Sequence, residues 1–216
     1  MNLNDAVATT LEDVIAQLGD IPSSRILTTP TPGTATLSDC VAINERQERP
    51  LCELVDGVLV EKAMGYEASV VAATIIRILG TFISKHRLGF VSGADGFFRL
   101  NASTRGPDVA FLSRKRLPEG RFPQEPYPQL VPELIVEVLS PGNTKGEMNR
   151  KRLEYFDNGV RLLWIVDCAH RTVAVYTSMA EFVVLGQEDT IDGGSVVAGF
   201  SVQVKDFFAD LDLLDS

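Results

Sequence analysis

Cysteine and histidine are scarce in this chain, and their scarcity excludes two common kinds of site. The three cysteines, Cys40, Cys52 and Cys168, are far apart and have no CxxC spacing. A disulfide framework or a zinc knuckle needs paired or regularly spaced cysteines, so we expect three buried free thiols. The two histidines, His86 and His170, are too few and too separated for a zinc or acid/base site, and we expect them at the surface or in turns.

Long apolar runs are also missing. No run approaches the roughly 20 residues that cross a bilayer, and the N-terminus lacks the basic region and apolar stretch of a signal peptide. We therefore expect a cytoplasmic protein with no membrane partner. The 216 residues, 45% of them hydrophobic, suffice for one buried core. We expect an N-terminal helix and Pro/Thr-rich extension over residues 1–35 and a single domain over residues 36–216.

The chain has no excess of positive charge either, because its net charge is −9. This charge opposes tight, sequence-independent binding to nucleic acid, which depends on neutralised phosphates. The segment 99–121 is an exception, with a local net charge of +4. Its six basic residues are Arg99, Arg105, Arg114, Lys115, Arg116 and Arg121. Such a stripe is either solvated surface or a binding track, and both remain open.

Hydrophobic periodicity predicts a mixture of helices and strands. Helical spacing is found over 4–18, 37–45, 67–86 and 145–158. Strands are expected near 90–91, 97–100, 108–112, 133–139, 162–166 and 172–176, with further β structure to about 204. Asp56-Gly57 predicts a hairpin over 53–60, the Pro-rich stretch 118–132 predicts a loop, and Glu147 has capping-box spacing from Thr144. This order indicates a mixed α/β sandwich, with a central mixed β-sheet flanked by helices.

Glu137 lies in the most hydrophobic strand-like stretch of the chain, residues 134–139. Side chains alternate along a strand, so Glu137 shares its face with Ile135 and Leu139, while the opposite face is also apolar. Apolar residues on both faces indicate a central strand with Glu137 at least partly buried. A buried carboxylate is costly without a partner, so we expect either a metal ion or an arginine beside it.

Asp108 begins another apolar run, directly after Pro107. The proline fixes the backbone and cannot donate a ladder hydrogen bond. Gly106-Pro107-Asp108 also suits a turn, in which the aspartate caps the backbone. Asp108 is therefore either a cap or a second acid that joins Glu137 in one site.

The helix predicted over 145–158 supplies a third side chain. Met148, Lys151 and Tyr155 fall at i, i+3 and i+7, which places Lys151 on the stripe that faces the sheet. The helix advances about 10 Å to Lys151 and the strand retreats about 7 Å to Glu137, so the two side chains can meet if the helix doubles back. The alternative is a lysine that lies over apolar surface with its ammonium in water.

Asp108, Glu137 and Lys151 together suit phosphodiester hydrolysis. Two carboxylates can hold Mg²⁺ with most of its waters, and the ion lowers the pKa of the attacking water and neutralises phosphate charge. A nearby ammonium stabilises the nucleophile and the developing charge. Without metal, adjacent carboxylates raise one another's pKa, so we expect such a site to hold a proton or a lysine contact.

An ordered set of sequence blocks resembles the Uma-two family of restriction-type endonucleases. The blocks are Cys52-Glu53-Leu54-Val55-Asp56-Gly57, Pro107-Asp108, Glu137-Val138-Leu139-Ser140-Pro141, Arg150-Lys151-Arg152-Leu153-Glu154-Tyr155-Phe156, Gly159-Val160 and Trp164-Ile165-Val166-Asp167. The resemblance covers roughly residues 36–208. The ordered set is far more specific than any single block.

This resemblance implies a restriction-endonuclease-like PD-(D/E)xK fold and a Mg²⁺- or Mn²⁺-dependent endonuclease that hydrolyses DNA. It also implies a homodimer, because such open-sheet domains often need a second subunit to hold a duplex. It implies Asp108 and Glu137 as metal ligands, with the carbonyl of Val138 completing the shell. The superfamily places a lysine two residues after the glutamate, where this chain has Leu139. Lys151, which matches the lysine in the family's helix, is the implied substitute.

Two further acids and two other functions remain open. A helix glutamate often joins such sites, so Glu67 is an accessory candidate, and Glu53 is another; a structural role is the alternative for both. Leu139 and the acidic net charge favour a nuclease-like fold that serves as a binding or assembly module with an inactive site. Asp108, Glu137 and a sheet-facing lysine favour the enzyme. A small-molecule phosphodiesterase would use the same metal chemistry.

Overall fold

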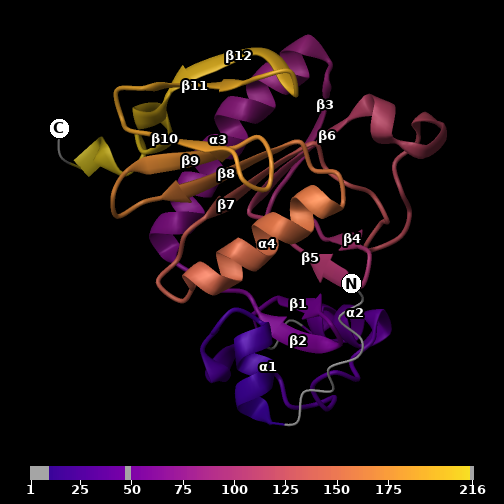
Figure 1. Cartoon of the computed structure of the whole chain (residues 1–216). Coiled ribbons are helices and arrows are strands. Elements are labelled where there is room, and N and C mark those ends of the chain that lie inside the picture. Colours follow the sequence, from indigo (N-terminus) through magenta and orange to yellow (C-terminus); the bar gives the residue numbers. More distant parts are fainter. Residues whose placement is uncertain (1–9, 47–49, 215–216) are drawn as a thin grey trace.

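The computed structural model describes residues 10–46 and 50–214 (Figure 1). The α-helices are α1 (Leu11–Gln17), α2 (Leu37–Glu45), α3 (Tyr66–His86) and α4 (Lys145–Asp157). The strands are β1 (Cys52–Val55), β2 (Val58–Glu61), β3 (Gly89–Ser92), β4 (Phe98–Leu100), β5 (Ser103–Arg105), β6 (Val109–Ser113), β7 (Leu134–Val138), β8 (Leu162–Asp167), β9 (Thr172–Tyr176), β10 (Phe182–Leu185), β11 (Thr190–Gly193) and β12 (Val197–Gln203). The order confirms the predicted mixed α/β class.

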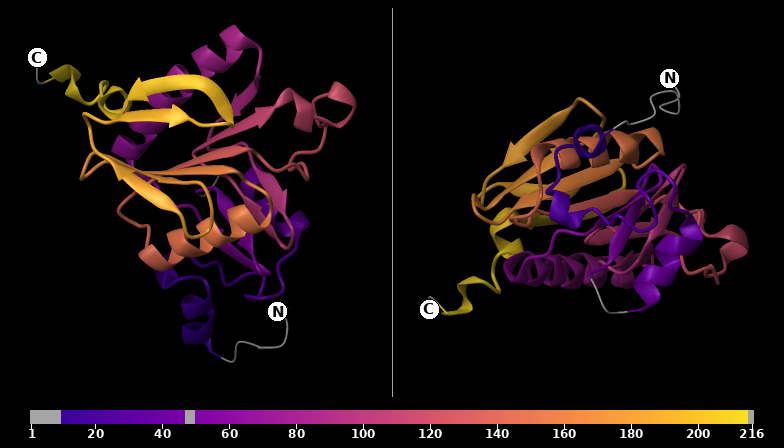
Figure 2. Two further views of the ribbon diagram at one scale, coloured as in Figure 1. Left: turned by 45° about the horizontal axis from the view of Figure 1, so that its top comes forward. Right: turned by 90° about the horizontal axis from the view of Figure 1, so that it is seen from below.

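The strands form one large mixed sheet and two smaller sheets. The large sheet has the order β10-β9-β8-β7-β6-β3, and β7 and β8 are its parallel pair. A second sheet has the order β2-β1-β5-β4, and β11 pairs with β12. Helix α3 covers one face of the large sheet and α4 the other, as the view from below shows (Figure 2). This arrangement places β7, and Glu137 within it, near the centre of the sheet.

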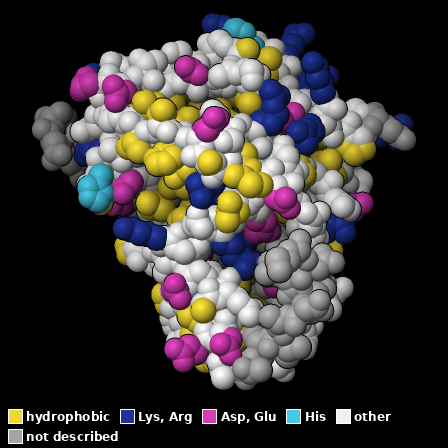
Figure 3. Space-filling view, in the orientation of Figure 1, with side chains coloured by type: hydrophobic (Ala, Val, Ile, Leu, Met, Phe, Trp, Pro, Cys, Tyr) yellow, Lys and Arg dark blue, Asp and Glu magenta, His cyan; other side chains and the backbone are white. Residues whose placement is uncertain are grey.

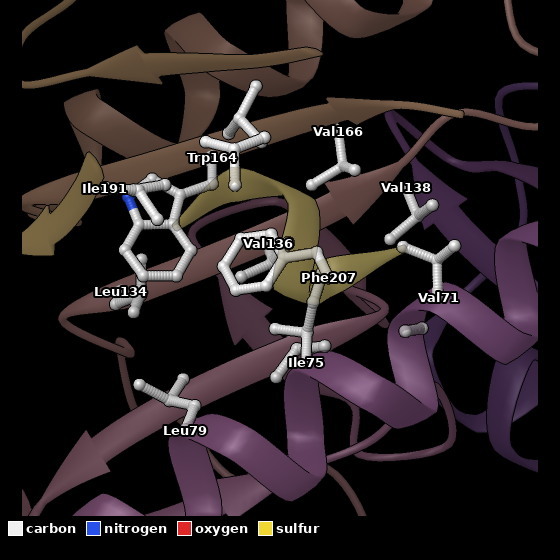
Figure 4. Close-up of a cluster of buried hydrophobic side chains, with 14 of the residues drawn as sticks. Val71, Ile75, Leu79, Leu134, Val136, Val138, Trp164, Val166, Ile191 and Phe207 are labelled. Carbon is white, nitrogen blue, oxygen red and sulfur yellow. The ribbon is translucent and has the colours of Figure 1, made fainter. Parts of the chain in front are cut away.

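The largest core cluster lies between α3 and the large sheet (Figure 4). Alternate residues of β7, Leu134, Val136 and Val138, enter this core together with Trp164 of β8. By length and composition α3 could also cross a membrane, but its apolar residues, Ile75 among them, pack into this core. Packing against the sheet therefore explains the apolar composition of α3.

The opposite face of β7 meets α4. Ile135 packs with Tyr155 of α4 and Leu163 of β8 in a separate cluster. This confirms the alternation expected for the strand, because Ile135 and Glu137 lie on the α4 face while the other residues enter the α3 core. Met148, Lys151 and Tyr155 are buried on α4, so the predicted inward stripe of this helix is also confirmed.

The segment that precedes α2 packs against the β1–β2 hairpin and α4. Leu18, Ile21 and Ile26 join apolar residues of the hairpin in one cluster. The hydroxyl of Thr144 donates to the carbonyl of Gly19. These contacts bring the N-terminal segment alongside the start of α4 (Figure 1). The predicted division of the chain into an extension over residues 1–35 and a domain over 36–216 stays a prediction, because these contacts do not define a domain boundary.

Several expected elements differ in detail. The first helix, expected over 4–18, is α1, Leu11–Gln17, and the expected residues before 10 lie outside the described ones. The expected loop 118–132 contains one short 3-10 turn, Pro118–Gly120. Strand β5 was not predicted, because Ser103-Thr104-Arg105 has no apolar residue and hydrophobic patterning cannot detect it. The three cysteines are buried thiols, as expected.

Apolar side chains gather on the surface over the edge of the large sheet beside α4 (Figure 3). Three consecutive residues of the edge strand β10, Phe182, Val183 and Val184, are exposed. The basic segment 99–121 is not a continuous surface stripe, because Arg105 is only 3% exposed and is paired with acids. Arg114 and Lys115 are exposed, so a shorter basic surface remains.

Candidate active site

Asp108 is tied to the end of β7 by its carboxylate. Oδ2 of Asp108 accepts a hydrogen bond of 2.8 Å from the backbone N–H of Val138. Asp108 lies just before β6, which pairs antiparallel with β7. The carboxylate therefore does not cap its own turn; the amide that it accepts from is 30 residues away, directly after Glu137.

Glu137 meets α4 in a closed, buried cluster. Nζ of Lys151 lies 3.1 Å from Oε1 and 3.3 Å from Oε2 of Glu137. The hydroxyl of Tyr155 donates to the same Oε1. The predicted contact between Lys151 and Glu137 is thus present. Because Oε1 already accepts from two donors, Oε2 is the oxygen with more free capacity.

Glu53 of β1 and Arg105 of β5 extend this cluster on the far side of Lys151. Nζ of Lys151 lies 3.2 Å from Oε1 of Glu53, and Nη1 of Arg105 lies 2.8 Å from Oε2. The Arg105 guanidinium also donates through Nε and Nη2 to Oε2 of Glu154. The second sheet therefore supplies an acid that holds Lys151 and an arginine that holds the acid.

Lys62, directly after β2, reaches Asp108. Its Nζ lies 3.3 Å from Oδ1 of Asp108 and also donates to the carbonyls of Gly106 and Ala94. The side chain of Lys62 is mostly buried, so water screens little of the attraction between its ammonium and the Asp108 carboxylate. Sequence reasoning missed this residue. Its position two residues beyond the predicted hairpin was the available signal, but its partner is distant in the chain.

Burial and neighbouring charges shift the pKa values of the two glutamates that share Lys151 in opposite directions. Burial raises the pKa of Glu137, and the negative charges of Asp108 and Glu53 add to this effect against the opposing charge of Lys151. Burial would also raise the pKa of Glu53, but Lys151 and Arg105 outweigh it and lower that pKa to about 2. The difference follows from Arg105, which contacts Glu53 and not Glu137. Glu137 is therefore the acid of the pair that takes up a proton more readily.

Lys151 and Tyr155 are held in their protonated forms. Burial would lower the pKa of Lys151, but the charges of Glu137 and Glu53 outweigh it and raise the pKa above its ordinary value. Burial raises the pKa of the Tyr155 phenol, and the charges of Glu137 and Glu53 raise it further. Neither group can act as a base near neutral pH. Both can donate hydrogen bonds, and Lys151 supplies a fixed positive charge.

The remaining candidate residues fall in different places. The side chain of Val138 is buried in the α3 core, so only its backbone faces Asp108. Glu67 is exposed, and among the described residues no hydrogen bond or ion pair joins it to this cluster. Leu139 is half-buried and its N–H donates to the carbonyl of Val166. Leu139 directly follows β7, and β7 itself contains no lysine.

Glu147 is not the side-chain cap that its spacing predicts. Thr144 caps α4 by accepting from the backbone N–H of Glu147, as expected. The Glu147 carboxylate instead forms a buried, two-pronged ion pair with Arg25 and accepts from Asn143. Burial would raise the pKa of Glu147, but hydrogen bonds from Arg25 outweigh it and lower the pKa. The partner lies more than a hundred residues away, which spacing alone does not reveal.

The donor set suits a hard divalent cation, although the lysines now occupy part of it. Among the described residues, no three Asp, Glu, His or Cys side chains are grouped so that they could hold a metal ion. Mg²⁺ needs only one or two carboxylates and keeps several waters. In the connected cluster four carboxylates, of Glu53, Asp108, Glu137 and Glu154, face the three cations of Lys62, Arg105 and Lys151. One negative charge is left for a proton or a metal ion to balance.

Comparisons with known proteins agree with this fold. A crystal structure of "a putative nuclease belonging to DUF820" from Anabaena variabilis is similar with a TM-score of 0.67 and 19% identity. The match covers 74% of this chain and 90% of that one, and at this identity it shows the fold alone. No curated protein matches the chain. The family model described as "Uma2: Putative restriction endonuclease" matches residues 38–205, and the chain therefore belongs to this family of restriction-endonuclease-like nucleases.

Proposed function

We propose that this protein is a metal-dependent endonuclease that hydrolyses phosphodiester bonds in DNA. The observation that carries the proposal is the hydrogen bond from the Val138 N–H to Oδ2 of Asp108, which fixes a second carboxylate beside Glu137. Family membership supports a nuclease. We propose the metal, the DNA substrate and the roles of the individual residues in addition to that membership.

Asp108, Glu137 and the backbone carbonyl of Val138 would hold Mg²⁺ or Mn²⁺. Oxygen donors of this kind are those that both ions accept in proteins. When bound, the ion would lower the pKa of an attacking water and neutralise charge on the phosphate. Oε2 of Glu137 has more capacity for this purpose, because it accepts only the 3.3 Å contact from Lys151 while Oε1 accepts from both Lys151 and Tyr155.

Lys151 provides positive charge and does not remove a proton. Glu53 and Glu137 hold its ammonium from two sides at 3.2 and 3.1 Å, which fixes its position and keeps it protonated. A cation held in a buried site stabilises developing negative charge without the cost of reorganising solvent. Glu53 is a positioning residue in this scheme, because it acts through Lys151.

A nuclease-like binding module remains the second candidate, and one observation favours it. Both lysines already neutralise the carboxylates, through Lys62 on Asp108 and Lys151 on Glu137. A module with an inactive site would keep these ion pairs and never exchange them for a metal ion. The expected homodimer and cytoplasmic location also stay predictions.

Nicking of supercoiled plasmid tests the proposal. We expect Mg²⁺- or Mn²⁺-dependent conversion to the open circle, abolished by EDTA and reduced at least a hundredfold in Asp108→Asn, which removes about 3 kcal/mol of transition-state stabilisation. Asp212→Asn, which alters an aspartate paired with Arg171 away from the cluster, is the matched control. Equal nicking by wild type and Asp108→Asn would show that the activity does not belong to this site.

A further inference from the structure

A cavity of about 430 Å³ opens beside Asp108. Its polar lining consists of Lys62, Ser69, Asp108 and Ser140, and neither Glu137 nor Lys151 is among the lining residues. The side chain of Asp108 is 21% exposed, whereas those of Glu137 and Lys151 are 6% and 4% exposed. A substrate that approaches the carboxylates therefore meets the Asp108 side first, through this cavity.

The walls of the cavity are mostly apolar, and alanines make up much of them. Its alanines are Ala63, Ala68, Ala72, Ala73 and Ala94. The larger apolar side chains of the lining are Pro50, Leu51, Met64 and Ile76, and Met64 is 71% exposed. The volume lies in the range of sites for small organic ligands, which are mostly apolar with a few placed polar groups. A flat aromatic group fits such walls, and the exposed Met64 can cover it.

Single-stranded nucleic acid offers an aromatic group of this kind directly beside a phosphodiester. Base stacking on aromatic side chains contributes much of the affinity for unpaired strands and tolerates any sequence, and a flipped-out base also packs against apolar side chains. In a duplex the bases are stacked inside and cannot enter a pocket unless the nucleotide is flipped out, which costs several kcal/mol. The first residue of α3, Tyr66, is 89% exposed and adds an aromatic surface next to Gly65 of the cavity lining.

The net charge of the protein also favours an unpaired strand over duplex DNA as the ligand. Binding to duplex DNA relies mainly on neutralised phosphates, and a net charge of −9 opposes it. A ligand recognised through its base depends less on that electrostatic contribution. One buried cation in the cavity lining, Lys62, is enough to offset the charge of Asp108.

We infer that this cavity binds one unpaired nucleotide of the substrate, with its base against the alanine walls and its phosphodiester at the Asp108 end. The inference rests on the proposed nuclease function and names its substrate class: a strand that is single-stranded or locally unpaired at the point of cleavage. Paired DNA is expected to be the poorer ligand and the poorer substrate.

Fluorescence anisotropy with the full-length protein tests the inference. The probes are a fluorescein-labelled single strand of about 12 nucleotides and the blunt duplex of the same sequence, with Ca²⁺ in place of Mg²⁺ to slow cleavage. The wild type is expected to bind the single strand about tenfold more tightly than the duplex. Ala73→Leu adds bulk at an exposed wall position, and Met64→Ala removes the exposed cover; both should abolish this preference.

Thr81→Leu is the control, because Thr81 is exposed on the same helix outside the cavity lining. It should keep the tenfold preference. The inference is overturned if the wild type binds both probes equally, if it binds neither, or if Ala73→Leu and Met64→Ala both keep the preference. Single-strand binding without metal-dependent cleavage of any DNA would instead refute the nuclease function and leave the pocket standing.

Discussion

Nζ of Lys62 lies 3.3 Å from Oδ1 of Asp108, so a cation already rests on an oxygen that the proposed metal would use. The same ammonium donates to the carbonyls of Gly106 and Ala94, which brings two loops to Asp108. Lys62 therefore both orders the site and competes with a metal ion for it. This double role is open to a direct test.

Lys62→Met should lower the Mg²⁺ concentration for half-maximal nicking by about tenfold. A unit positive charge near the ligand oxygen opposes a divalent cation, and its removal at the effective dielectric of a partly buried site is worth more than 1 kcal/mol. The maximal rate should fall, because the two loops lose their tether. Lys205→Met removes a surface lysine that lies at the same distance of 3.3 Å from Glu188, and it should change neither quantity. An unchanged Mg²⁺ requirement in Lys62→Met would refute the competition.

Lys151→Met should destabilise the fold by about 3–5 kcal/mol, measured by urea unfolding at neutral pH. The substitution leaves Glu53 and Glu137 buried without their shared cation. Adding Glu137→Gln to this variant should recover part of the loss, because one of the two unpaired charges is removed. Lys145→Met, at the exposed first residue of the same helix, serves as the control and should remain within about 0.5 kcal/mol of the wild type. A loss no larger than that of the control would show that Lys151 is not held as described.

Glu53 makes the stability of the protein depend on pH in the acid range. Its pKa is about 2 in the folded protein, against 4.5 for the free side chain. A lowered pKa adds stability above about pH 4.5, and this stability is lost as the pH falls towards 2. The difference in unfolding free energy between wild type and Glu53→Gln should therefore be largest at pH 6 and shrink on acidification.

Urea unfolding at pH 6, 4 and 3 measures this difference. Glu188→Gln, at a glutamate whose side chain is 80% exposed, is the control substitution at the surface. A difference for Glu53→Gln that stayed constant from pH 6 to 3 would mean that the Glu53 carboxylate is not held by Lys151 and Arg105.

Gly146 lets the N-terminal segment pack against α4. A Cβ at this position would lie 2.5 Å from the carbonyl oxygen of Gly19. Gly146→Ala should therefore push the segment away, weaken the ion pair between Arg25 and Glu147, and cost about 1–3 kcal/mol. Faster tryptic cleavage after Arg25 should accompany this loss.

Gly80→Ala is the matched control for Gly146→Ala. Gly80 is inside α3, and a Cβ there would meet nothing within 4 Å. Because alanine is the better helix residue, this variant should gain about 0.5–1 kcal/mol. If both variants proved more stable than the wild type, the close approach of Gly19 to Gly146 would be refuted.

The sequence predicted the elements and the strand alternation well, because those depend on local periodicity. Glu137 and Lys151 were placed on facing surfaces from their positions in a strand and a helix, and the structure confirms their contact. The pairing of Arg105 with Glu53 was not foreseen. It depends on β5, which has no apolar residue to mark it as a strand.

Ion pairs between residues far apart in the chain could not be predicted from the sequence. Lys62 and Asp108 are 46 residues apart, and Arg25 and Glu147 are 122 residues apart. Helix-cap spacing gave Glu147 a sufficient local role, so nothing in the sequence required a distant partner. The two residues of such a pair are close in space, but their spacing along the chain follows no pattern that would reveal the contact.

Binding of Mn²⁺, measured by isothermal titration calorimetry, tests the central claim most directly: that Asp108 and Glu137 form one divalent-cation site. The account predicts one ion per chain, bound at least tenfold more weakly after either Asp108→Asn or Glu137→Gln. Asp212→Asn should bind as the wild type does. No binding by the wild type, or binding of equal strength in both site variants, would contradict it.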